Sequence, residues 1–130
     1  MGGPLLIDTN VLIDLFKGRL PTLAEEQLVS VLNNDEYYLS VITKIELLDF
    51  KTDDTLQMQF LAEIVENSTV LALSDEIVER TILLRGERKI KLPDSIIAAT
   101  ALVHNLTLIS RNVKDFAHVA ELIHINPYAL

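Results

Sequence analysis

The sequence contains no cysteine, and only 5% of its 130 residues are aromatic. The lack of cysteine excludes disulfide bonds, thiolate zinc sites and cysteine nucleophiles. Three histidines, His104, His118 and His124, are separated by 14 and 6 residues, a spacing unlike that of paired histidine ligands. A metal site in this chain would therefore depend on oxygen ligands.

Long hydrophobic runs are also missing. No uninterrupted apolar stretch approaches the roughly 18 residues that a membrane-spanning helix needs, and MGGPLL at the N-terminus does not resemble a secretory signal. We therefore expect a cytoplasmic protein that does not contact a membrane. Hydrophobic residues make up 49% of the chain and the mean hydropathy is +0.30. Such a content indicates either a dense core or an apolar surface that another chain covers.

The net charge of −8 argues at first against a nucleic-acid partner. Its distribution is uneven, because seven of the eleven basic residues but only two acidic ones lie between positions 80 and 114. This segment is either a solvated helix face or a local patch for a polyanion. Its basic residues are Arg80, Arg85, Arg88, Lys89, Lys91, Arg111 and Lys114.

Short apolar strands alternate with helical patterns along the chain. Strands are predicted at residues 5–7, 37–39, 70–73, 106–109 and 122–125. Helices are predicted at 11–17, 22–33, 41–50, 56–65, 75–85 and 92–102, with a turn or short helix at 113–116. Ser40 and Ser74 are expected as N-caps, and Pro93 in the first turn of the helix that it opens. This order indicates one α/β domain, residues 1–130, with a mainly parallel sheet between helices in a three-layer sandwich.

Four acidic residues stand close to the predicted carboxyl ends of strands or in the helices that follow. Asp8 comes directly after the first strand, and Glu46 lies early in the helix after the second. Asp94 lies in the first turn of an apolar helix, and Asp115 follows the strand that ends before Ser110. Because ligand sites of parallel sheets lie beyond the carboxyl ends of the strands, we expect these acids to converge at one edge.

Each acid also has an ordinary explanation. Asp8 and Asp115 are suited to capping a turn or helix, Asp94 to complementing a helix dipole, and Glu46 to facing solvent. The four together are harder to explain in this way, because gathered carboxylates repel one another unless a cation intervenes. Oxygen-only ligands favour Mg²⁺ or Mn²⁺ over zinc or copper. Such ions commonly bind through carboxylates and substrate phosphates, which points to phosphoryl chemistry.

At these residues the sequence resembles the PIN-domain family of metal-dependent nucleases and, within it, the compact VapC-type toxin ribonucleases. The likeness covers nearly the whole chain. It rests on four stretches that agree in order and spacing: IDTNVLID with Asp8, LSVITKIELL with Glu46, LPDSIIAATAL with Asp94, and LTLISRNVKDF with Asp115. Many relatives carry an acid two residues after the Ser or Thr of the last motif, where this chain has Asn112.

The resemblance implies a PIN-like fold and a Mg²⁺- or Mn²⁺-dependent endoribonuclease that leaves 5′-phosphate and 3′-hydroxyl ends. Asp8, Glu46, Asp94 and Asp115 are then the catalytic residues and hold one or two ions. Residues expected to orient them are Asn10, Thr43, Ser110 and Asn112.

The resemblance also implies partners. The substrate would be RNA, with transfer and ribosomal RNA as candidates, and an antitoxin protein would hold a homodimeric toxin inactive. The candidate contacts to the RNA backbone are Arg85, Arg88, Lys89, Lys91, Arg111 and Lys114. The surface that pairs with another chain is not evident from the sequence: residues 28, 29 and 32 and the stripe from 56 to 65 are candidates, although core packing suits both.

Three other functions remain open at this point. A housekeeping PIN nuclease would process RNA without an antitoxin. A non-catalytic binding module would have kept the fold, although the full set of acids argues against it. An acid-phosphatase-like hydrolase with Asp8 as nucleophile would need a second acid two residues later, where this chain has Asn10.

Overall fold

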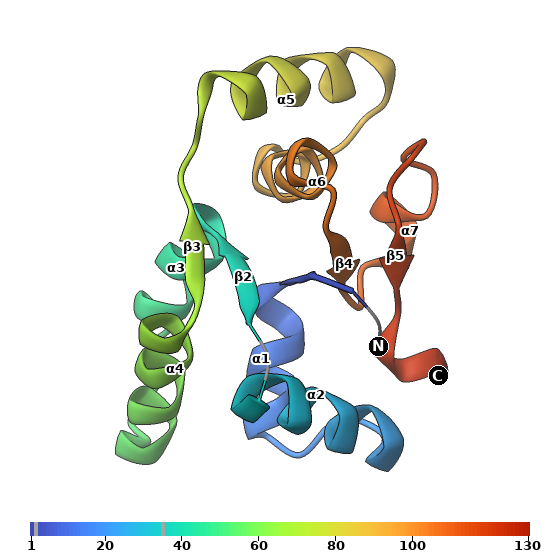
Figure 1. The fold of residues 1–130 in the computed structure, drawn as a ribbon. Helices are drawn as coiled ribbons and strands as arrows, with labels where there is room; N and C mark the ends of the chain where they lie inside the picture. Colours follow the sequence, from blue (N-terminus) through green and yellow to red (C-terminus); the bar gives the residue numbers. More distant parts are fainter. Residues whose placement is uncertain (2, 35) are drawn as a thin grey trace.

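The computed structural model describes residues 1, 3–34 and 36–130 and contains a five-stranded parallel sheet between two layers of helices (Figure 1). The strands are β1 (Leu5–Ile7), β2 (Tyr37–Ser40), β3 (Thr69–Leu71), β4 (Thr107–Ile109) and β5 (His124–Ile125). The helices are α1 (Thr9–Phe16), α2 (Thr22–Asn34), α3 (Val41–Leu48), α4 (Thr55–Asn67), α5 (Asp75–Glu87), α6 (Leu92–His104), α7 (Val113–Phe116) and the 3-10 helix η1 (Pro127–Ala129). The predicted α/β sandwich is confirmed.

The strand order is β3-β2-β1-β4-β5. From β1 the chain builds one half of the sheet through β2 and β3, and it then returns to the other side of β1 to add β4 and β5. Every neighbouring pair is parallel. The boundary between β1 and β4 is thus the point where the strand order reverses, the place where open α/β sheets form ligand sites.

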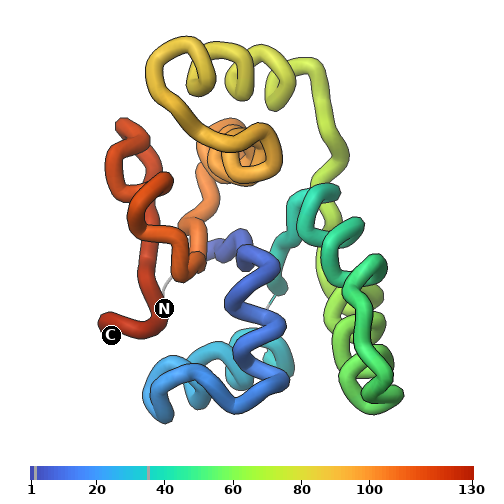
Figure 2. The backbone as a smooth tube through the Cα atoms, turned by 180° about the vertical axis from the view of Figure 1, so that it is seen from behind, coloured from blue at the N-terminus to red at the C-terminus, as the bar shows by residue number. Residues whose placement is uncertain are grey.

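The side chains of β1 alternate between the two faces of the sheet and take part in two separate layers of the core. Leu5 and Ile7 pack with α1, α2 and α4 on one face, whereas Leu6 packs with α5, α6 and α7 on the other. Figure 2 shows α1 and α2 on the side of the sheet opposite to α5 and α6. Because successive side chains of a strand point to opposite faces, three residues are enough to anchor both layers.

Helix α6 is the most deeply buried helix, with seven consecutive buried residues from Ser95 to Ala101. Ala98, Ala99 and Ala101 allow close packing against the sheet and α5, and Asn105 ends the helix in the left-handed conformation at φ 55°. The predicted caps are confirmed, since Ser40 accepts from the backbone N–H of Ile42 and Ser74 from that of Ile77.

Two predicted strands differ from those observed by two residues at one end. Strand β5 begins at His124 instead of 122, because Glu121 adopts φ 68° and the N–H of Leu122 closes a turn onto the carbonyl of Val119. Strand β3 ends at Leu71, and Leu73 lies in the connection to α5 with 48% of its surface exposed. An apolar run is a poor guide to the last residue of a strand, because apolar residues also occur in turns.

Within the described residues, no helix combines the length and the apolar character needed to cross a bilayer.

Candidate active site

Asp8 stands where the strand order reverses, directly after β1. Its N–H donates to the carbonyl of Ile109 at 2.9 Å and so continues the pairing between β1 and β4. Its side chain also caps α1, because Oδ1 accepts from the backbone N–H of Thr9 at 2.8 Å. The explanation of Asp8 as a cap is therefore correct, and it leaves the second carboxylate oxygen for other partners.

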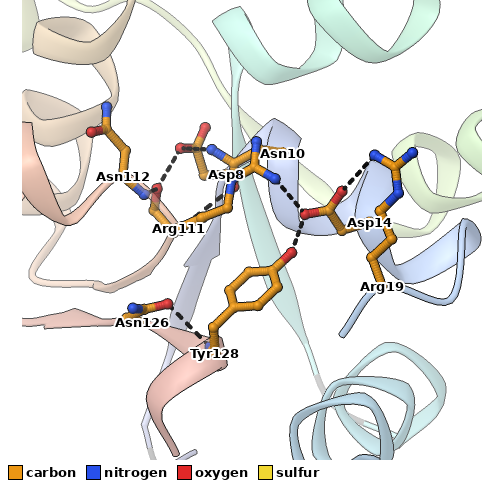
Figure 3. A network of polar contacts seen from close by, with 9 residues as sticks. Asp8, Asn10, Asp14, Arg19, Arg111, Asn112, Asn126 and Tyr128 are labelled. Carbon is orange, nitrogen blue, oxygen red and sulfur yellow. Dashed lines mark hydrogen bonds and ion pairs between the residues drawn. The ribbon is translucent and has the colours of Figure 1, made fainter. Parts of the chain in front are cut away.

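That second oxygen accepts two neutral side-chain donors. Ser110 Oγ lies 2.7 Å and Asn10 Nδ2 3.2 Å from Asp8 Oδ2, and Figure 3 shows the surroundings of this carboxylate. Only 4% of Asp8 is exposed. Burial raises the pKa of Asp8, and the charge of Glu46 raises it further against the opposing effect of the hydrogen bonds.

Glu46 reaches the site from the exposed side of α3. Its Oε1 accepts from Thr9 Oγ1 at 2.6 Å, and the same hydroxyl lies 3.2 Å from Thr43 Oγ1. The predicted orienting residue Thr43 therefore contacts Glu46 through Thr9. Thr9 was not predicted from the sequence, although its place between Asp8 and Asn10 was a signal.

The side-chain amide of Asn112 contacts both Asp94 and Asp115. Asn112 Nδ2 lies 3.0 Å from Asp115 Oδ2 and 3.4 Å from Asp94 Oδ2. The carbonyl oxygen of the same amide accepts from the backbone N–H of Asp115, and the backbone N–H of Asn112 donates to Ser110 Oγ. At the position where the resemblance suggested an acid, Asn112 thus supplies a donor between two carboxylates.

The charges of the other three acids act on Asp94. Burial raises the pKa of Asp94 to about 6, and the nearby charges of Asp8, Asp115 and Glu46 add to this effect, while Lys91 opposes it. Of the groups that the structure describes, no lysine or arginine forms an ion pair with any of the four within 4.0 Å. The site therefore contains four acidic side chains whose hydrogen-bond donors are all uncharged.

This donor set suits a hard divalent cation. Its ligands would all be carboxylate oxygens, and a cation would relieve the repulsion that adds to the effect of burial on the pKa of Asp94. As the described side chains stand, no three His, Asp or Glu residues are placed to share one ion. The chemistry of the residues fits Mg²⁺ or Mn²⁺, and joint ligation of one ion by three of them would require their side chains to move closer together.

The predicted RNA contacts fall into two groups. Arg85, Arg88 and Lys89 line one surface hollow of about 530 Å³ beside the α5–α6 connection. The two arginines also stabilise this connection, because Arg85 Nε donates to the carbonyl of Ile90 at 3.3 Å and Arg88 Nη1 to that of His118. Lys91 is the N-cap residue of α6.

Arg111 and Lys114 lie elsewhere, on the segment that follows β4. Lys114 is exposed on α7. Arg111 forms an ion pair with Asp14 of α1, at 2.8 Å between Nη1 and Oδ2. Arg111 and Lys114 thus lie on a different segment from Arg85, Arg88 and Lys89, and they do not line the same hollow.

Asp14 is a second buried acid that sequence reasoning missed. Only 3% of it is exposed, and it accepts from the hydroxyl of Tyr128 as well as from Arg111 (Figure 3). Burial, assisted by the hydrogen bond to Asp14 and its charge, raises the pKa of Tyr128 to about 12. The only sequence signal was an acid within the apolar pattern of VLIDLF, and nothing local identified its partners.

His124 also supports the site without entering it. Its Nε2 lies 2.9 Å from the carbonyl oxygen of Ser110, and its ring packs edge-on against Phe116. His124 therefore has a structural role, because it contacts the backbone of the loop that carries Ser110.

Comparisons with known proteins place this geometry in context. The model of the PIN domain family matches residues 5–122. A ribonuclease VapC of Rickettsia bellii is 30% identical, with 91% of this chain and 92% of that protein covered, and a ribonuclease VapC1 of Haemophilus influenzae is 32% identical, with 90% and 92% covered. A chain in the structure of a toxin–antitoxin complex from Klebsiella pneumoniae is 36% identical with a TM-score of 0.76, covering 95% of this chain and 98% of that one.

The raised pKa of Asp94 predicts how stability depends on pH. Because this pKa is about 6 in the fold and 3.8 ordinarily, the folded state binds the proton more tightly than the unfolded chain. Ionisation of Asp94 therefore lowers the free energy of unfolding as the pH rises from below 4 to above 6. In chelator at pH 8, Asp94→Asn should raise the melting temperature by about 2–5 °C, with solvent screening at this half-exposed group keeping the gain small.

The gain should disappear at a pH well below 3.8, where Asp94 is protonated in both the folded and the unfolded state. Thermal melts followed by circular dichroism would measure it, with Asp53→Asn as a matched control on an exposed acid. A lower melting temperature for Asp94→Asn at pH 8 would contradict the prediction that the ionised carboxylate destabilises the fold.

Proposed function

Since the chain belongs to the PIN domain family, we propose that it is an endoribonuclease and the toxin of a toxin–antitoxin pair. The observation that carries the chemistry is the meeting of four carboxylates from four segments at the carboxyl edge of a parallel sheet, with the pKa of Asp94 raised to about 6. The relatives named ribonuclease VapC and the structures of toxin–antitoxin complexes support RNA as substrate and an antitoxin as partner.

In this proposal Asp8, Glu46, Asp94 and Asp115 would hold one or two Mg²⁺ or Mn²⁺ ions. The chemistry that such ions supply is neutralisation of the phosphodiester charge and activation of water at neutral pH. Mutual repulsion among the four acids favours cation binding, because every positive charge that enters the site lowers their electrostatic energy.

The other polar residues orient these carboxylates. Ser110 and Asn10 hold one oxygen of Asp8, and Thr9 holds Glu46. Asn112 donates to Asp94 and Asp115. Because these donors are uncharged, they fix the carboxylates in place without cancelling the charge that attracts a cation.

The RNA backbone is proposed to contact basic residues that lead towards Asp94. Lys89 is exposed beside Arg85 and Arg88, and the charge of Lys91 acts on Asp94. The contacts of the two arginines to backbone carbonyls leave their positive charge uncompensated. Lys114, which follows Asp94 in the chain, belongs to the same proposal, whereas the guanidinium of Arg111 is paired with Asp14.

The protein partners are proposed to cover apolar surface. A hollow of about 440 Å³ lies between α2 and α4, lined by side chains that include Phe16, Val29, Leu32 and Phe60, and it suits the antitoxin. Leu28, by contrast, is fully buried. Ile82 and Leu83 on α5 expose 66% and 59% of their surface, and this face of α5 is the candidate contact surface of a homodimer. The proposed place of action is the cytoplasm.

Cleavage of RNA tests the activity. Purified protein with Mn²⁺ or Mg²⁺ should cut total cellular RNA into fragments with 5′-phosphate and 3′-hydroxyl ends, and chelator should stop the reaction. Asp8→Asn should lower the rate at least about a hundredfold, because it removes a ligand charge at the centre of the site. Asp53→Asn should cleave as the unchanged protein does. A fully active Asp8→Asn protein would contradict the assignment of the site, and no cleavage with either metal would favour a non-catalytic binding module.

Salt dependence tests the basic residues. In the inactive Asp8→Asn background, replacing Lys89 and Lys91 by Gln should weaken RNA binding. It should also reduce the slope of log affinity against log salt by about 0.7 for each phosphate that is no longer neutralised. Fluorescence anisotropy with a labelled single-stranded RNA measures both, and Lys51→Gln is the control. An unchanged slope would remove these two lysines from the interface.

Expression in bacteria tests the role as a toxin. Induction should arrest growth, Asp8→Asn should abolish the arrest, and co-expression of a small protein encoded immediately upstream should relieve it. Colony counts after induction measure the effect. Normal growth with an active nuclease would favour a housekeeping role in RNA processing.

A further inference from the structure

Asp14 is a buried acid that the proposed chemistry does not use. It lies in the second half of α1, and 3% of it is exposed. Its Oδ2 accepts from Arg111 Nη1 at 2.8 Å and from the hydroxyl of Tyr128, and its Oδ1 lies 3.9 Å from Arg19 Nη1. Figure 3 shows these three side chains directed at the one carboxylate.

The partners of Asp14 come from distant parts of the chain. Arg111 lies between β4 and α7, 97 residues from Asp14, and Tyr128 lies in η1, 114 residues away. A buried carboxylate without its partners is costly, because it is cut off from water without compensation. The three segments are therefore fastened to one another at this point.

The residues on both sides of Arg111, Ser110 and Asn112, contact acids of the candidate active site. Ser110 donates to Asp8, and Asn112 contacts Asp94 and Asp115. The backbone N–H of Arg111 itself donates to Asn10 Oδ1 at 3.3 Å. Any movement of Arg111 would thus be transmitted to three of the four acids.

We propose that Asp14 is a positioning residue that holds Arg111 and, through it, the loop from Ser110 to Asn112 against Asp8, with Tyr128 fastening the C-terminal segment to the same carboxylate. This inference rests on the proposed nuclease function for its effect on catalysis. It assigns to Arg111 a structural contact in place of a primary contact with RNA.

The surroundings of the cluster support this role. The guanidinium of Arg111 pairs with Asp14, whose side chain is only 4% exposed, although 54% of the arginine side chain is open to solvent. Tyr128 remains a hydrogen-bond donor over the whole working pH range, since its pKa is about 12. Arg19 contributes little, because its pair with Asp14 is long and its side chain is 62% exposed.

Kinetics of RNA cleavage separate positioning from RNA binding. Asp14→Asn and Arg111→Gln should each lower kcat by about tenfold and leave KM within about twofold, because the loop is displaced but the RNA contacts remain. The double variant should be no slower than the slower single variant, since both substitutions break the same interaction between Asp14 and Arg111.

Arg111→Lys should keep most of the kcat that Arg111→Gln loses, and Tyr128→Phe should lower kcat about two- to threefold. Arg19→Gln is the matched control on the same carboxylate and should be unchanged.

Amide hydrogen exchange gives a readout that does not need activity. In Asp14→Asn the amides of Arg111 and Asn112 should exchange at least about ten times faster, while amides in the middle of α6 keep their protection. A merely structural role would lower the melting temperature and leave both the kcat of the folded protein and these two amides unchanged.

The outcomes distinguish this inference from the proposed function. If the unchanged protein cleaves RNA and the folded variants keep both kcat and slow exchange, the positioning role is overturned. It is also overturned if Arg111→Gln raises KM alone and reduces the salt slope, which would make Arg111 an RNA contact. If the unchanged protein cleaves nothing, the nuclease proposal fails, and faster exchange at Arg111 and Asn112 still supports the fastening by Asp14. Should Asp14→Asn not fold, Arg111→Gln and Tyr128→Phe carry the same measurements.

Discussion

Electrostatic repulsion at the carboxyl edge of the sheet is the constraint on which the structure of the site depends. Burial raises the pKa of Asp94 to about 6, and the charges of Asp8, Asp115 and Glu46 add to this effect. A fold that gathers like charges has to be stabilised elsewhere. Here the apolar layers on the two faces of the sheet supply that stability, and strand β1 contributes to both.

The two buried acids of the first motif show how environment gives one residue type two roles. Asp8 is held by uncharged donors from Ser110, Asn10 and the backbone of Thr9. Asp14, six residues later, is paired with Arg111 and Tyr128. A carboxylate that keeps its charge uncompensated is suited to binding a cation, whereas one that is already paired with a guanidinium is suited to joining segments of the chain.

The topology explains why residues distant in sequence meet. With β1 and β4 adjacent and parallel, the segments that follow them emerge side by side, so that Asp8 and Ser110 are in contact across 102 positions. Helix α6 enters beside them after the α5–α6 connection and brings Asp94. The same arrangement lets Asn112 take the place of an acid, because its amide can satisfy Asp94 and Asp115 together.

The sequence by itself determined the types and order of the helices and strands, the caps Ser40 and Ser74, and the four acids as candidates. Each of these follows from local patterns: apolar periodicity, capping residues, and acids placed next to strand ends. Only the tertiary structure decided that Thr9 holds Glu46, that Asn112 joins two carboxylates and that Asp14 meets Arg111 and Tyr128. These contacts join side chains from separate elements, and their geometry depends on how the two helical layers pack on the sheet, which no short stretch of sequence encodes.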